Sequence, residues 1–310
     1  MSVLKRFRQQ RHVLGSRADI VLVAADYESI EHVFHSVWHT ITEFDIRFSR
    51  FRPDSEISQF NEKAGQWVGI SADFTELLTV CKKYAHITEG LFNPFVLPAL
   101  QAAGYRGSWP HVEQADPLLD VRSRHMVSSN EIEITEVSAR IPEETAIDIG
   151  GIGKGYMLDT LAALLERMNV SRYYISLGGD IICHGFDADY NPWRIGISAA
   201  RQRGARVGLI SNNIGEVLAI ASSSVVRRSG SGWHHIIDPR TGKPTSTSIL
   251  MATVVASSGT AADIFAKTCI IDPEAHCLKD QIDSSIKAIC LQLKDTSVTV
   301  PFGSNLIVIS

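Results

Sequence analysis

Residues 146–159 read AIDIGGIGKGYMLD, a stretch that joins an apolar run to four glycines, a lysine and a helix-like pattern. The apolar positions over 146–150 predict a strand, and those that follow Lys154 predict a helix as far as Met168. Glycines at such a junction let the backbone approach an anion, and the N–H groups at a helix start point toward it. The stretch therefore fits a phosphate-binding turn, and equally a structural turn without a ligand.

The same stretch departs from two common nucleotide-binding motifs. A P-loop has Ser or Thr directly after its lysine, whereas Gly155 follows Lys154 here. A Rossmann domain repeats strand–helix–strand units, and no such repeat follows residue 159. An NAD-dependent dehydrogenase is therefore disfavoured.

Outward from this stretch, the periodicity predicts three more helices and many short strands. An apolar run at 19–24 leads into a helical pattern from 27 to 44, and further helices are expected over 74–87 and 260–271. Strand-like runs with tight turns between them fill most of the chain beyond residue 172, which is typical of an antiparallel sheet.

The composition is that of a folded protein close to electroneutrality. Of 310 residues, 45% are hydrophobic and 21% charged, which is the globular range. The net charge of −4 argues against a dedicated nucleic-acid binder. Because no repeat or linker marks a boundary, we expect one α+β domain over residues 1–310, with residues 1–13 extended or flexible.

Cysteine spacing and the N-terminus bear on the compartment. The five cysteines are far apart, which favours neither a disulfide framework nor a zinc site. A basic N-terminal cluster is followed by Arg17 and Asp19 and not by the apolar core of a signal peptide. No apolar run reaches the ~18 residues of a membrane span. We expect a reduced, cytoplasmic protein without membrane insertion.

Two further turns carry polar side chains. One is ISLGGD, residues 175–180, and the other is HHIIDPRTGKP, residues 234–244. Gly, Pro and Asp are ordinary turn residues, so both segments have a structural interpretation. The functional alternative makes His235 a base and Arg240 a phosphate ligand.

Taken together and in order, these segments resemble the ApbE-type FAD:protein FMN transferases. The matching segments span residues 14–270 and are RFSRFRPDSEISQFN, GLFNPFVLPAL, AIDIGGIGKGYMLD, ISLGGDI, WRIGI, ASSSVVRR, HHIIDPRTGKP and AADIFAKT. The resemblance implies a single α+β domain of two lobes, with mixed or antiparallel sheets, flanking helices and an FAD cleft between the lobes. It also implies transfer of FMN from FAD to a threonine of an acceptor protein, release of AMP, and magnesium at the phosphates.

The resemblance assigns metal ligands, and one of them is altered in this chain. The carbonyl of Gly153 and the carboxylate of Asp263 match the family pattern, whereas Lys267 stands where a threonine is usual. An ammonium cannot ligate a cation. Either Lys267 replaces the metal, or Thr268 ligates it, or the metal is held weakly. In a fourth interpretation Lys267 pairs with Asp263 and the protein only binds or hydrolyses flavin.

The other implied roles concern FAD and the transferred group. His235 is expected near the attacking threonine, and Asp238 is expected to orient it or to hold the turn. Asn93 stands where the family has an aspartate. Residues expected to contact FAD are Ser49, Glu56, Ser58, Asn61, Asn93, Asp148, Gly150, Gly151, Lys154, Asp180, Ser223, Arg240 and Thr241. Helix capping is the structural alternative for the SEIS segment, and an Asx-type turn is the alternative for Asp180.

Overall fold

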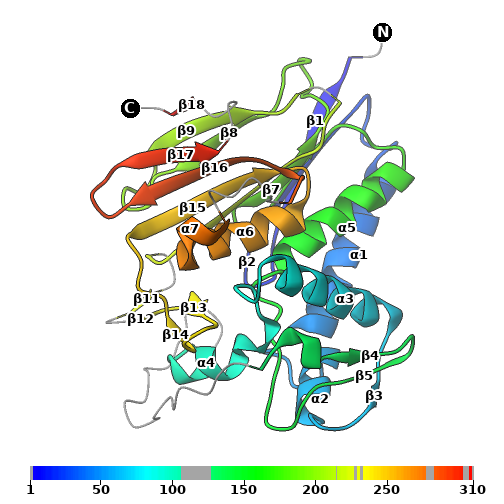
Figure 1. The fold of residues 1–310 in the computed structure, drawn as a ribbon. Coiled ribbons are helices and arrows are strands. Elements are labelled where there is room, and N and C mark those ends of the chain that lie inside the picture. The colour runs from blue at the N-terminus through cyan, green and yellow to red at the C-terminus, as the bar shows by residue number, and fades with distance from the viewer. Residues whose placement is uncertain are drawn as a thin grey trace.

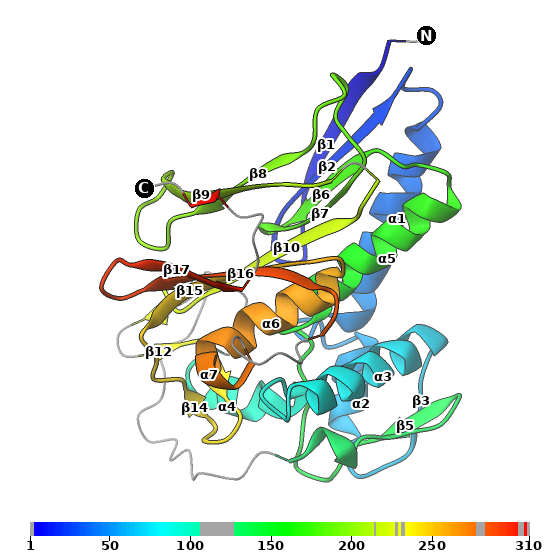
Figure 2. The same cartoon turned by 45° about the horizontal axis from the view of Figure 1, so that its top comes forward.

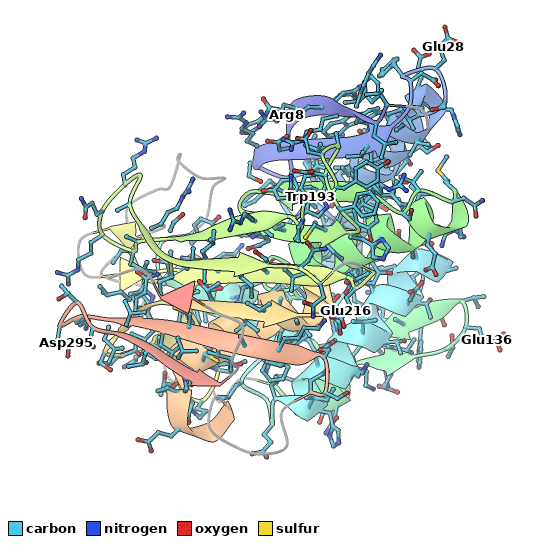
Figure 3. The ribbon with its side chains drawn as sticks, turned by 90° about the horizontal axis from the view of Figure 1, so that it is seen from above. Arg8, Glu28, Glu136, Trp193, Glu216 and Asp295 are labelled. Atoms are coloured by element: carbon cyan, nitrogen blue, oxygen red, sulfur yellow. The ribbon has the colours of Figure 1, made fainter. Side chains whose placement is uncertain are left out.

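The main sheet has eight antiparallel strands in the order β1-β2-β6-β7-β10-β15-β16-β17 (Figure 1). The computed structural model of the protein describes residues 3–105, 127–213, 215–226, 229–230, 233–276, 283–302 and 307–308. The strands are β1 (Lys5–Val13), β2 (Ser16–Ala24), β6 (Tyr173–Leu177), β7 (Asp180–His184), β10 (Leu218–Ser224), β15 (Ile249–Ala256), β16 (Ile286–Leu293) and β17 (Val298–Phe302). Arg8 lies on the edge strand β1, and Asp295 lies in the turn before the opposite edge strand (Figure 3).

Helices cover one face of this sheet (Figures 1 and 2). The longer ones are α1 (Glu31–Phe48), α3 (Ala72–Ile87), α5 (Gly153–Arg167) and α6 (Gly259–Ile271), and the shorter ones are α2 (Glu56–Glu62), α4 (Leu97–Ala102) and α7 (Pro273–His276). α6 lies against β10 and β15 and packs on α5, so it is enclosed between the sheet and the other helices. This position explains its composition, because a helix that is apolar on all sides must be buried on all sides.

Smaller sheets complete the fold. β8 (Arg194–Ser198), β9 (Arg206–Ser211) and β18 (Ile307–Val308) form a three-stranded sheet on the other face of the main sheet, where Ile195 and Ile210 pack against Ile181 and Ile220 (Figure 2). The remaining short strands are β3 (Val68–Gly69), β4 (Glu133–Ile134), β5 (Ser138–Arg140), β11 (Ser229–Gly230), β12 (Trp233–His234), β13 (Ile237–Asp238) and β14 (Lys243–Pro244). Two single-turn 3₁₀ helices cover Pro94–Val96 and Ser129–Glu131.

The predicted helices are confirmed, and the predicted strand at 146–150 is wrong. That segment joins no sheet, and its last residue lies in a turn. Its backbone is held by partners outside any sheet. The Asp148 N–H donates to the Pro94 carbonyl at 2.8 Å, and the N–H and the carbonyl of Ile147 both bond to the Asn61 side chain. Residues 5–13, expected to be extended or flexible, form the edge strand β1.

The expectation of uniformly reduced cysteines is also wrong. Cys81, Cys183 and Cys290 are free and buried, whereas Cys269 is bonded in a disulfide whose partner lies outside the described residues. Among the helices that the structure describes, none is long and apolar enough to span a membrane.

Candidate functional site

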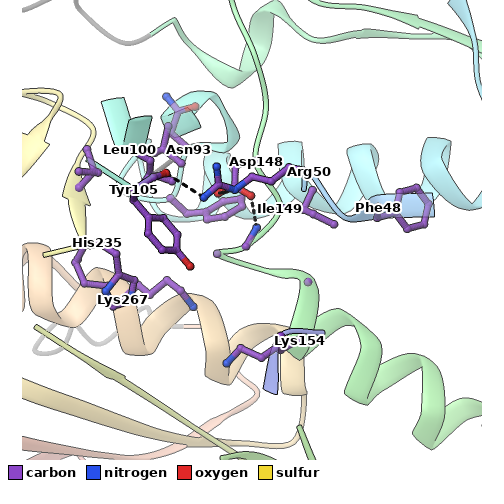
Figure 4. Close-up of a pocket in the computed structure, with 18 of the residues that line it drawn as sticks. Phe48, Arg50, Asn93, Leu100, Tyr105, Asp148, Ile149, Lys154, His235 and Lys267 are labelled. Atoms are coloured by element: carbon purple, nitrogen blue, oxygen red, sulfur yellow. Dashed lines mark hydrogen bonds and ion pairs between the residues drawn. The ribbon is translucent and has the colours of Figure 1, made fainter. Parts of the chain in front are cut away.

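A cavity of about 370 Å³ opens where the end of α1, the 148–154 loop, α6 and the segment 235–237 meet (Figure 4). Its volume is within the range of small-molecule sites. One part of the wall is apolar and aromatic, with Phe44, Phe48, Phe51, Leu91, Phe92, Val96, Leu100, Tyr105, Ile236 and Ile237. The other part carries Lys154 and Lys267, whose side chains extend into the same space from α5 and α6 (Figure 4). The cavity therefore offers an apolar wall for rings and a cationic end.

The loop before α5 is held in place by side chains from distant parts of the chain. The Asp148 carboxylate accepts the Gly150 N–H at 2.8 Å, which tightens the turn. Asn61 donates to the Ile147 carbonyl at 3.0 Å and accepts the Ile147 N–H at 2.9 Å. These bonds fix the loop where it borders the cavity.

Arg50 borders the cavity and was not among the predicted site residues. Its guanidinium Nε lies 3.6 Å from a carboxylate oxygen of Asp148, and both side chains are less than a tenth exposed. The guanidinium also lies over the ring of Phe51, at 4.4 Å. It lies 4.9 Å from the centre of the Tyr105 ring, and Arg50 and Tyr105 are both labelled in Figure 4. The only sequence signal was the arginine-rich segment RFSRFRP, which does not tell one arginine from the next.

His235 is half-buried on the opposite wall, with its ring 6.5 Å from that of Tyr105. The neighbouring His234 fixes this segment, because its Nε2 lies 3.0 Å from the Thr245 carbonyl and its Nδ1 accepts the Ile236 N–H at 3.3 Å. Burial lowers the pKa of His234, which keeps the ring neutral and able to accept that N–H. His235 thus borders the cavity from a segment that the hydrogen bonds of His234 hold in place.

Two lysine–aspartate pairs form the cationic end. Lys154 pairs with Asp180 at the start of β7, and Lys267 pairs with Asp263 one turn earlier on α6. Burial raises the pKa of Asp180, and the Lys154 charge opposes that shift. Burial acts on Asp263 in the same direction, but the charges of Lys267 and Lys154 and hydrogen bonds from Lys267 and Gly155 keep its pKa below the usual value.

The donor set around Asp263 does not fit a magnesium ion. One carboxylate oxygen accepts from the Lys267 ammonium and the other accepts the Gly155 N–H at 3.1 Å, so both are occupied by donors. The Thr268 hydroxyl donates to the Phe265 carbonyl of its own helix at 3.3 Å. Magnesium prefers several oxygen ligands in an octahedron, and an ammonium stands among them here. Within the described part of the chain, no group of three or more His, Cys, Asp or Glu could hold a metal.

About half of the predicted site residues line this cavity. They are Ser49, Asn93, Asp148, Gly150, Gly151, Gly153, Lys154, His235, Lys267 and Thr268. The Asn93 side chain accepts the Phe95 N–H at 2.9 Å and donates to the Val127 carbonyl at 2.9 Å, so it caps the turn after it.

Other predicted residues lie outside the lining and have structural partners. Glu56 accepts from the backbone and hydroxyl of Ser71 at the start of α3, and the N–H of Ser58 donates to Ser55, which caps α2. Asn61 holds the Ile147 backbone, and Asp180 accepts the Ser222 N–H at 3.3 Å. Asp263 lies beneath Lys267 and is 1% exposed.

In the turn after His235, the polar side chains also bond mainly to one another and to the turn's own backbone. The Asp238 carboxylate accepts from the Arg240 backbone and guanidinium, and Arg240 also donates to Asp272 at 2.7 Å. Thr241 lies in the same turn, where its hydroxyl accepts the Lys243 N–H at 3.3 Å. Neither Asp238, Arg240, Thr241 nor the buried Ser223 of β10 lines the cavity, so ligand contacts by these residues stay predictions.

Comparison with known proteins gives one consistent family. The ApbE family model matches residues 14–289. The chain is similar to an FAD:protein FMN transferase of Haemophilus influenzae, at 28% identity over 76% of this chain and 69% of the relative. It is similar to another of that name from Vibrio cholerae, at 29% identity over 72% and 68%.

Solved structures agree in fold. The ApbE protein of Thermotoga maritima superposes with a TM-score of 0.82 at 21% identity, covering 95% of this chain and 96% of the other. The flavin transferase ApbE of Vibrio cholerae gives 0.80 at 23% identity, with 97% and 98% covered. These values show a shared single-domain fold. The chain belongs to the ApbE family.

Proposed function

We propose that the protein transfers FMN from FAD to a threonine hydroxyl of an acceptor protein and releases AMP. The observation that carries the proposal is the cavity, in which an aromatic and apolar wall ends at two ammonium groups. Flat rings suit the apolar wall, and a diphosphate suits the ammonium groups. Membership of the ApbE family supports the same activity, as do the names of the relatives.

The reaction moves one phosphoryl group. The threonine oxygen attacks the phosphorus of the FMN half, and the bond from that phosphorus to the bridging oxygen breaks. AMP leaves with the bridging oxygen, the threonine becomes a phosphoester of FMN, and the hydroxyl proton is released. With water as the attacking group the products are FMN and AMP.

The chain's own residues divide this work. His235 takes the hydroxyl proton as it leaves, since it borders the cavity and a histidine is suited to proton transfer near neutral pH. Lys154 and Lys267, the positive ends of two ion pairs, face the phosphate charges, and phosphoryl transfer depends on such electrostatic stabilisation together with positioning. Asp148 and Arg50 hold the wall in which Ser49, Asn93 and the Gly150–Gly151 backbone meet the ligand.

Two further expectations do not enter this mechanism. Magnesium is left out because two of its implied ligands are engaged, Asp263 with Lys267 and the Gly155 N–H, and Thr268 with the Phe265 carbonyl. The cytoplasm stays a prediction, and the Cys269 disulfide is more typical of an oxidising compartment. Immunoblotting of cell fractions decides between the two compartments.

The test is the fate of FAD. Purified protein is incubated with FAD, and AMP and FMN are quantified by chromatography. Equal amounts of AMP and FMN support the proposal, and unchanged FAD in every buffer refutes it. His235→Ala should lower the rate about 100-fold, as expected for loss of a general base. The matched control is His39→Ala, which removes an exposed histidine of α1 and should leave the rate unchanged.

The acceptor is tested separately. A candidate acceptor is co-expressed with the protein, and covalent flavin is detected as fluorescence of the acceptor band in a denaturing gel. Replacing the acceptor's threonine by valine should abolish the signal, because valine keeps the shape of the side chain without the hydroxyl.

A further inference from the structure

Lys267 is the one residue of α6 that is not buried. The other twelve residues from Gly259 to Ile271 are buried, whereas the Lys267 side chain keeps 19% of its surface exposed and borders the cavity. A lysine at the single open position of an otherwise enclosed helix is fixed by the packing of the whole helix. The packing of the helix therefore fixes the backbone position from which the Lys267 side chain reaches the cavity, and the pairing with Asp263 holds its ammonium there.

The Lys267 and Lys154 ammonium groups act on the same region. Asp263 feels the charge of Lys154 as well as that of Lys267, and Asp180 feels the charge of Lys267 as well as that of Lys154. Each lysine stem also passes a glycine turn: an added Cβ at Gly151 would lie 3.8 Å from Cδ of Lys267, and one at Gly178 would lie 3.8 Å from Cδ of Lys154. The two ammonium groups thus lie on either side of one space, which the backbone of the Gly151 and Gly178 turns borders.

A divalent cation cannot join this arrangement without displacing a cation already present. The Lys267 ammonium donates to a carboxylate oxygen of Asp263 and, at 3.0 Å, to the Asp263 carbonyl. A metal at that carboxylate would meet the ammonium at close range, where like charges repel strongly because burial weakens screening.

We infer that the Lys267 ammonium, with Lys154, takes over the role of a divalent metal at the FAD diphosphate, so that FAD binding and cleavage proceed without magnesium. This inference rests on the proposed function. Both ammonium groups border the cavity and their aspartate partners lie beneath it, so the positive ends of two ion pairs face the two negative charges of the diphosphate. The FMN half keeps one of these charges when AMP leaves. The metal dependence of the reaction is then set by one side chain of α6.

The first experiment compares the wild type and Lys267→Thr in EDTA and in magnesium. Wild-type AMP release should be the same in both within about twofold. AMP release by Lys267→Thr should be about 100-fold slower in EDTA, because the variant lacks a group that stabilises charge in the transition state. Its rate should recover when magnesium is added. Lys83→Thr makes the same change on the exposed face of α3 and should behave as the wild type. A wild-type rate abolished by EDTA refutes the inference and leaves the proposed function standing.

The second experiment does not depend on turnover. Mn²⁺ binding is followed by electron paramagnetic resonance, and thermal unfolding is followed with and without magnesium. The wild type should bind no Mn²⁺ and show no magnesium-dependent shift. Lys267→Thr exposes the Asp263 carboxylate, so it should bind Mn²⁺ and unfold at higher temperature in magnesium. Stoichiometric Mn²⁺ binding by the wild type overturns the inference even if FAD is never cleaved.

A third variant guards against misfolding, because Lys267→Thr leaves a buried carboxylate without its cation. Lys267→Gln keeps a hydrogen-bond donor and most of the volume but removes the charge. Circular dichroism checks its fold, and flavin fluorescence measures FAD affinity in EDTA. We expect affinity to fall at least tenfold, and unchanged affinity refutes a charge role for Lys267.

Discussion

Replacing Gly155 by alanine should separate two helices on which both the fold and the cavity depend. α5 and α6 are in close contact at Gly155 and Gly259. A Cβ at Gly155 would lie 2.7 Å from Cβ of Asp263 and 2.8 Å from the carbonyl carbon of Gly259, closer than real Cβ contacts come. Because one of these neighbours is backbone, the helix itself must shift by several tenths of an ångström.

The cost has three parts. Overpacking of this kind destabilises by about 2 to 3 kcal/mol. The shift also lengthens the 3.1 Å bond from the Gly155 N–H to the buried Asp263 carboxylate, which adds about 1 to 2 kcal/mol. The better helix propensity of alanine returns about 1 kcal/mol. The expected loss in the free energy of unfolding is about 3 kcal/mol, or roughly 1 M in the urea midpoint at a slope of about 3 kcal/mol/M.

Gly153→Ala is the matched control two residues away. A Cβ there would lie 3.6 Å from Ile149 and Phe44, which is ordinary contact. Its urea midpoint, followed by far-UV circular dichroism, should stay within about 0.3 M of the wild type, since the change costs less than about 1 kcal/mol. Equal midpoints for the two variants would refute the claim that α5 and α6 meet too closely at Gly155 for a side chain.

Three further substitutions test other contacts. Asp159→Ala removes the acceptor of three bonds at the start of α6, at 2.6 to 2.9 Å, and should lower the free energy of unfolding by about 2 to 3 kcal/mol, measured by urea titration. Asn61→Ala removes both hydrogen bonds to the Ile147 backbone, so it should lower the free energy of unfolding by about 2 kcal/mol and slow AMP release. Unchanged kinetics would mean that these bonds do not hold the loop in its active position. His234 has a lowered pKa, so the unfolded state binds its proton at higher pH than the folded state, and stability should fall as the pH drops from about 7 to about 5. His234→Gln should flatten that slope, and an equal slope in both proteins would contradict the assignment.

The long-range contacts explain what the sequence could and could not predict. Periodic apolar positions predicted the four longer helices correctly, because a helix buries one stripe wherever it packs. The segment at 146–150 was predicted as a strand because its apolar pattern is that of a strand. Its hydrogen-bond partners are Asn61 and Pro94, far away in the sequence, and no local pattern announces them.

The site was predictable to the extent that its chemistry lies in short motifs. Lys154, His235 and Lys267 stand in segments that a family pattern identifies, and all three border the cavity. Arg50 and Tyr105 were missed because their contact joins residues 55 positions apart. Gly155 was interpreted as an anion-facing glycine, but the close approach that requires it is that of α6.

The two lysine–aspartate pairs are costly to bury, which suggests that they serve the cavity and not the stability of the fold. Burying a carboxylate and an ammonium is expensive, and a buried pair is often no more stabilising than apolar residues of the same volume. α6 is otherwise apolar enough to be enclosed completely, so its folding does not require Asp263 or Lys267. Both ammonium groups border the cavity while their carboxylates lie beneath it. The pairs are therefore better explained by the charge they hold at the cavity than by the stability they give the fold, and this charge is what Lys267→Gln removes.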